Sequence, residues 1–181
     1  LLKAVAEQNF NLVEVFGTIL NTTRQNLIAL LRGGEARQLM AAGLVPLQGD
    51  VANTPYEIPF LEQLDQVDSS GTLKGAVVAG AAAFQLGMQQ MLQQLSTMFP
   101  YASITYFNPE YQASWEAFGD RYGSFQDYGI SNTTEAAQAV ATDNAAPYLW
   151  VDDRHPTGSG HRMLARGVEL TLENNAKQIE A

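Results

Sequence analysis

The sequence contains no cysteine, few basic residues and no long uninterrupted apolar run. Without cysteine, a disulfide scaffold and thiolate chemistry are both excluded. The chain has 10 Lys and Arg residues against 19 Asp and Glu residues, which gives a formal net charge of -9. Because a nucleic-acid backbone or an anionic membrane is bound by clustered cations, we expect neither as a partner.

The most apolar stretch, Leu73 to Phe99, is interrupted by one lysine and several glutamines. It therefore predicts a helix that packs in a core, and not a transmembrane segment. The composition, 46% hydrophobic and 16% charged, is that of an ordinary globular protein long enough for one domain with a sizeable core. The first residues show neither the basic start nor the cleavage pattern of a signal peptide.

Apolar residues at helical spacing alternate along the chain with short apolar or β-branched runs. Helices are predicted at 12–32, 60–67, 73–99 and 158–173, and strands at 102–107 and, buried, within 37–47. Prolines predict a loop at 50–59, and the pattern at 111–128 predicts a short helix followed by irregular structure.

This order of elements predicts an α/β fold, because strands separated by long helices form parallel sheets with crossover connections. Only two strands are convincing. A parallel pair leaves backbone groups on its outer edges without partners, and parallel sheets are normally buried on both faces. We therefore expect another segment to complete the sheet.

Near the C-terminus, Asp152 and His155 stand three residues apart, followed by Pro156, Thr157 and the start of the last helix. A carboxylate at this spacing can reach a ring nitrogen of the imidazole around a tight turn, which the proline rigidifies. A serine hydroxyl needs a neutral imidazole to take its proton, and a carboxylate to fix the tautomer of that imidazole. We therefore interpret Asp152 and His155 as the acid and base of a serine-hydrolase triad.

The same residues would also fit a helix N-terminus with a capping aspartate and an exposed histidine. The strand-like lead-in at 148–151 favours the catalytic interpretation. Asp153 is interpreted as a solvated neighbour, a hydrogen-bonding partner or a cap, and His161 is given a structural or supporting role. A metal site from Asp152, His155 and His161 is possible by counting alone, and nothing else supports it.

Three blocks resemble the GDSL family of esterases and lipases, also called SGNH hydrolases. The most specific block, within 148–161, resembles the closing motif of that family. The segment 34–47 is similar to its glycine-alanine-arginine strand running into Leu-Pro-Leu, and 128–136 resembles more weakly the loop before the last block. The resemblance implies a three-layer α/β/α flavodoxin-like fold, to which residues 1–181 contribute the last strands of the parallel sheet and their flanking helices.

The resemblance also implies that Asp152 and His155 are the catalytic acid and base, that the substrate is an acyl or acetyl ester of a lipid or carbohydrate, and that no cofactor is needed. The family's Gly-Asp-Ser block and its oxyanion-hole blocks do not occur in the sequence. Ser159 lacks the strand-to-helix elbow of a nucleophile and lies too near His155. We therefore expect an N-terminal fragment of the same enzyme, carrying Gly-Asp-Ser, as a partner.

Two other functions stay open, namely a catalytically inactive SGNH-like binding or structural protein, and a lipid-binding helical module suggested by the methionines. The family resemblance and two sequons, at Asn21 and Asn132, indicate a secreted glycoprotein. Sequons also arise by chance, and Asn21 falls within a predicted helix.

Overall fold

The structure is a computed structural model of the chain. It describes residues 12–34, 36–42, 47–51, 53–107, 123–140 and 144–179. Within these ranges the chain combines helices with small parallel and antiparallel sheets, which confirms the predicted α/β class.

The chain divides into two compact units, which are described separately. Unit 1 comprises residues 1–44 and 70–108, and unit 2 comprises residues 45–69 and 109–181. Both residues of the Asp152–His155 pair belong to unit 2.

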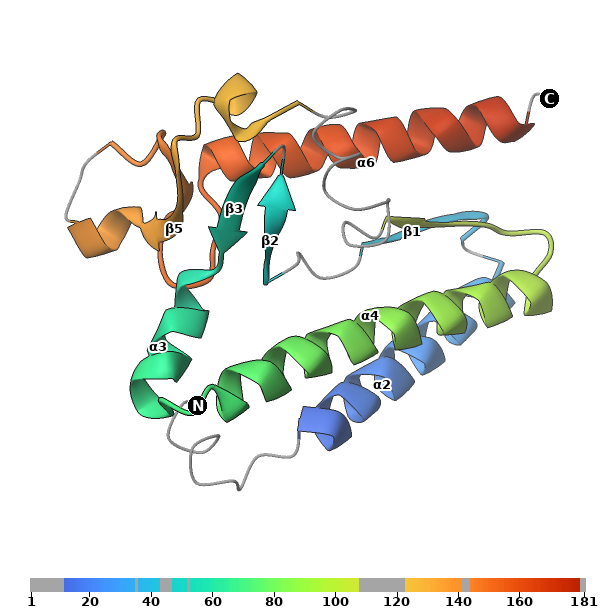
Figure 1. Cartoon of the computed structure of the whole chain (residues 1–181). Helices are drawn as coiled ribbons and strands as arrows, with labels where there is room; N and C mark the ends of the chain where they lie inside the picture. The colour runs from blue at the N-terminus through green and yellow to red at the C-terminus, as the bar shows by residue number, and fades with distance from the viewer. Residues whose placement is uncertain are drawn as a thin grey trace. The chain divides into compact units, whose positions relative to one another are not determined.

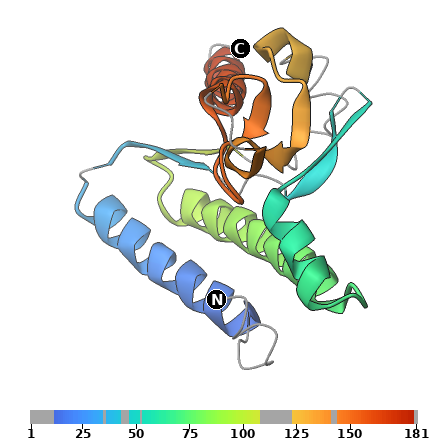
Figure 2. The same ribbon diagram turned by 90° about the vertical axis from the view of Figure 1, so that its left-hand side faces the viewer.

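In unit 1, two long helices lie side by side and pack on one face of a parallel strand pair (Figures 1 and 2). The elements are α2 (Leu12–Arg32), β1 (Gln38–Ala42), α4 (Thr72–Met98) and β4 (Ser103–Phe107). β1 and β4 pair in parallel, with Met40 beside Thr105, as the crossover pattern predicts.

The core of unit 1 lies between the helices and the strands. Its buried residues are Ile28, Leu31, Met88, Met91, Leu92, Leu95, Phe99 and Ala102, and alternate strand residues Leu39, Ala41, Ile104 and Tyr106 pack against them. The buried methionines therefore fill a core, which explains them without a lipid groove. The helices approach closely at Gly87, where an added Cβ would lie 2.7 Å from Leu20 Cδ1.

In the described part of unit 2, three short helices and one long helix accompany a hairpin and a parallel strand pair. The elements are β2 (Gln48–Val51), β3 (Thr54–Glu57), α3 (Pro59–Val67), η1 (Phe125–Tyr128), β5 (Asn132–Ala136), η2 (Ala137–Val140), β6 (Tyr148–Trp150) and α6 (Gly158–Ile179). β5 and β6 are parallel, and β2 and β3 are antiparallel. Thr133 Oγ1 donates to Pro55 O at 2.7 Å and the Trp150 indole donates to Thr133 O at 3.0 Å, so β5 is tied to both β3 and β6.

The predicted loop at 50–59 is wrong for most of its length, because the chain forms the β2–β3 hairpin there and α3 begins at Pro59. Asn53 adopts a left-handed φ of 61°, which allows the chain to reverse between the two strands. Pro55 is tolerated because its strand pairs only with β2, so the missing N–H breaks no second ladder.

The expectation of two strands is also too low, since the described chain contains six. Residues 132–136, expected within a loop, form β5. The strand predicted within 37–47 is present as β1, but Gln38 and Met40 are exposed and not buried. Residues 43–46 and 108–122 lie outside the described part.

The helices predicted at 12–32, 60–67 and 73–99 agree with the structure to within one residue, and the one predicted at 158–173 extends to Ile179. The short helix predicted after residue 111 falls on residues outside the described part. No helix in the described ranges is long and apolar enough to span a bilayer.

Leu95→Ala should lower the free energy of unfolding by about 2–5 kcal/mol, because Leu95 is fully buried and its removal leaves a cavity. Leu86→Ala on the same helix is the matched control, because Leu86 is 47% exposed, and its cost should stay within about 0.5 kcal/mol. Urea titration followed by circular dichroism measures both. Equal losses would contradict the assigned core.

Candidate active site

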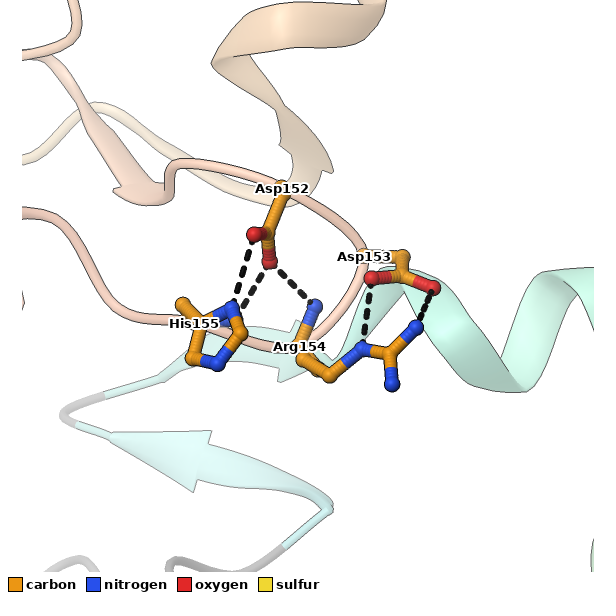
Figure 3. A network of polar contacts seen from close by, with 4 residues as sticks. All are labelled: Asp152, Asp153, Arg154 and His155. Atoms are coloured by element: carbon orange, nitrogen blue, oxygen red, sulfur yellow. Dashed lines mark hydrogen bonds and ion pairs between the residues drawn. The ribbon is translucent and has the colours of Figure 1, made fainter.

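The candidate site is the turn between β6 and α6. β6 ends at Trp150 and α6 begins at Gly158. On the turn between them the side chains of Asp152 and His155 meet, while the Arg154 side chain pairs with Asp153 (Figure 3). The predicted contact between Asp152 and His155 is present, with 2.7 Å between Oδ2 and Nδ1. The catalytic role of the pair stays a prediction.

The carboxylate of Asp152 closes the turn through both of its oxygens. Oδ1 accepts the backbone N–H of Arg154 at 2.9 Å and that of His155 at 2.7 Å. Oδ2 is hydrogen-bonded to the imidazole Nδ1 of His155 (Figure 3). Aspartate commonly folds back onto backbone N–H groups just after it. One side chain therefore shapes the turn and orients the ring.

The hydrogen bonds also set the charge of Asp152. Partial burial alone raises the pKa of this carboxyl, but the hydrogen bonds from Arg154 N, the His155 ring and His155 N outweigh burial and lower its pKa to about 2. The carboxylate is therefore ionised at neutral pH and can only accept hydrogen bonds.

The ionised carboxylate fixes the tautomer of His155. Because Asp152 can only accept, Nδ1 carries the proton and the lone pair of a neutral ring lies on Nε2. This is the arrangement that a general base needs. The His155 side chain is 66% exposed, and Nε2 has no hydrogen-bond partner among the described residues. Nε2 is thus accessible from solvent.

The backbone on either side of the turn is tied to β6. Val151 N donates to His155 O at 2.8 Å, and Pro156 forms a β-bridge with Trp150. Thr157 is buried, its N–H donates to Leu149 O at 2.8 Å, and its hydroxyl donates to the carbonyl of the first β6 residue at 2.7 Å. The returning chain therefore runs back along the strand that precedes the turn.

Thr157 also caps α6. Its Oγ1 accepts the N–H of Gly160 at 3.3 Å, which satisfies one of the free donors of the first helical turn. Gly160 is buried, and an added Cβ would lie 3.0 Å from Pro156 Cβ and 3.1 Å from Leu149 O. Glycine therefore lets α6 start in close contact with the turn and β6.

A contact that the sequence does not predict joins the turn to α3. The N–H of Phe60, in the first turn of α3, donates to Asp153 O at 2.9 Å. Pro59 signals the start of this helix in the sequence, but no local pattern indicates where its free N–H groups bind. The backbone of the turn is thus held from a distant segment of unit 2.

Asp153 is a hydrogen-bonding partner, one of the roles expected for it. Its two oxygens accept Nε and Nη2 of Arg154, both at 2.9 Å. Since Arg154 is largely exposed, such a pair contributes little to stability. Asp153 does not contact the imidazole.

His161 lies in the first turn of α6, as predicted. Its Nδ1 donates to Thr157 O at 2.9 Å. No carboxylate of the described ranges pairs with its ring. Ser159 is buried, and its hydroxyl accepts Nη2 of Arg162 at 2.8 Å. Neither side chain completes a triad with His155.

The apolar side of the turn is closely packed. The cavity lined by Leu149, Trp150, Pro156, Gly160, Met163 and their neighbours measures about 20 Å³, which is too small for an acyl chain. It therefore supports the turn and does not serve as a substrate pocket.

The two sequons differ in their surroundings. Asn21 is exposed on α2, whereas Asn132 Nδ2 donates to Glu135 Oε2 at 2.6 Å. Nδ2 is the atom that a glycan would modify. Glycosylation of either residue stays a prediction.

Within the described residues, no group of three His, Asp or Glu side chains could hold a metal ion.

No family model matches the chain, and the comparison with curated proteins finds no significant match.

Gly160→Ala should lower the free energy of unfolding by about 1–3 kcal/mol, because the new methyl group meets backbone and a proline ring at 3.0–3.1 Å. Gly158→Ala is the control, since nothing lies within 4 Å of its added Cβ. Denaturant titration of both variants checks this. Equal stability would show that α6 does not press on β6.

The carboxyl of Asp152 should titrate near pH 2 in the folded chain and near pH 3.9 in the urea-unfolded chain. Because the unfolded state binds the proton first, this group stabilises the fold above about pH 4, and its contribution is lost as pH falls towards 2. Carbon NMR of the carboxyl measures both midpoints. A folded-state midpoint at or above the unfolded one would contradict the closed turn.

Proposed function

We propose that this chain supplies the acid–base half of a serine ester hydrolase. The observation that carries the proposal is the 2.7 Å contact of His155 Nδ1 with the ionised Asp152, which leaves Nε2 exposed. Asp152 and His155 thus provide two of the three groups of a Ser-His-Asp triad. The carboxylate contacts Nδ1, and the neutral imidazole has its lone pair on Nε2, where the serine hydroxyl would bind. The resemblance of 34–47 and 148–161 to GDSL enzymes supports the same reaction class and the flavodoxin-like SGNH fold.

The serine and the oxyanion donors are assigned to an N-terminal companion segment. The serine hydroxyl gives its proton to His155 Nε2 while its oxygen attacks the ester carbonyl. The imidazolium then protonates the departing alkoxide, which leaves an acyl-serine and a free alcohol. Water then attacks the carbonyl of the acyl-serine while His155 Nε2 takes its proton. The imidazolium returns that proton to the serine oxygen as the carboxylic acid is released.

Asp152 acts throughout by holding the Nδ1 proton and stabilising the imidazolium, and it stays ionised. The substrate class is an acyl or acetyl ester of a lipid or carbohydrate, and no cofactor takes part. The proposed location is extracellular, in keeping with the sequons.

The test uses the chain purified with whatever polypeptide remains bound to it. A fluorophosphonate probe should label a serine on a companion polypeptide, and native mass spectrometry should show that polypeptide together with this chain. If only this chain is found, folded and without esterase activity, the proposal fails and an SGNH-like binding or structural protein takes its place.

Asp152→Asn in that assembly should lower kcat by about 10⁴-fold, because the amide can donate to Nδ1 and so favour the wrong tautomer. Asp153→Asn is a matched control one residue away, and it should leave kcat within about twofold because Asp153 contacts only Arg154. Hydrolysis of a chromogenic ester measures both. Equal losses in the two variants would remove the assignment of Asp152.

A further inference from the structure

The peptide groups of β1 alternate between its two edges. The N–H of Ser103 donates to Arg37 O at 2.9 Å, so the carbonyl of Arg37 faces β4. In a parallel ladder the N–H and C=O of one residue point to the same side, and the next residue points to the opposite side. The peptide groups of Leu39 and Ala41 therefore face β4, and those of Met40 face away from it.

The outer edge of β1 has no strand beside it among the described residues, because β1 and β4 form a sheet of two strands. The side chains of Gln38 and Met40 are exposed, on the sheet face opposite the one that Leu39 and Ala41 turn to the helices. Parallel strands occur in sheets of several strands, where backbone groups on both edges are paired. A further strand is therefore required, and it can lie beside β1 or beside β4.

The positions of the helices decide between the two edges. α2 leads into β1 and α4 leads into β4, and both helices pack on the same face of the sheet (Figure 2). Crossovers between parallel strands are almost always right-handed, so successive crossovers on one face add strands in one direction. A strand that precedes α2 must then lie on the side of β1 away from β4.

We propose that the outer edge of β1 binds a parallel strand from the companion polypeptide that precedes this chain, and that the amide of Met40 pairs with it. The inference rests on the proposed function, because that polypeptide is the companion segment assigned the serine. The occupant is an extended chain held by main-chain hydrogen bonds.

The companion polypeptide, encoded upstream of Leu1 in the same reading frame, is produced separately and titrated into this chain. Met40→Pro should weaken assembly about tenfold, because proline fits an extended edge but removes the outward N–H. Met40→Ala, which keeps that N–H, should assemble within about twofold of the unchanged chain. Circular dichroism verifies that both variants fold.

Hydrogen exchange of the unchanged chain gives a second measurement that needs no variant. The Met40 amide should exchange at least about tenfold more slowly in the assembly than in the chain alone. Unchanged exchange in an assembly that the fluorophosphonate labels would overturn the edge assignment and leave the proposed function standing. Protection of the Met40 amide in an assembly that the fluorophosphonate does not label would support the edge assignment and overturn the proposed function. Protection in the chain alone, at concentrations where it self-associates, would identify a second copy as the occupant and overturn the inference.

Discussion

The carboxylate of Asp152 is the group on which the candidate site depends. It accepts two backbone N–H groups with one oxygen and the imidazole of His155 with the other. These hydrogen bonds keep the carboxyl ionised at neutral pH, and the ionised carboxylate in turn determines which imidazole nitrogen carries the proton. The shape of the turn, the ionisation of the acid and the tautomer of the base are thus consequences of one side chain.

Such a turn can orient a reacting group only if the backbone around it is fixed. Thr157 fixes it on one side by hydrogen bonds to two carbonyls of β6, and Gly160 allows the following helix to pack directly against the strand. On the other side, Phe60 holds the carbonyl of Asp153. The imidazole of His155 itself is left exposed, so the hydrogen bonds that hold the turn lie in the backbone and the ring lies at the surface.

Much of this site could be predicted because it is local in sequence. The spacing of Asp152 and His155 predicts their contact, and the periodic apolar residues predict α2 and α4 to within one residue. The strand at Asn132–Ala136 could not be found in the same way, because its residues are mostly polar and its pairing with β6 is non-local. The bond from Phe60 is equally invisible in the sequence, since a backbone N–H carries no side-chain signature.

The same bond from Phe60 has a kinetic consequence. It joins residues about ninety positions apart, so α3 must be in place before the turn reaches its final rigidity. Contacts of high sequence separation form late because the chain first loses the entropy of a long loop. We therefore expect the contact between Asp152 and His155, which lie three residues apart, to form earlier in folding than the bond from Phe60 that holds the surrounding backbone. A partly folded chain would then have the contact between Asp152 and His155 before Phe60 fixes the backbone of the turn.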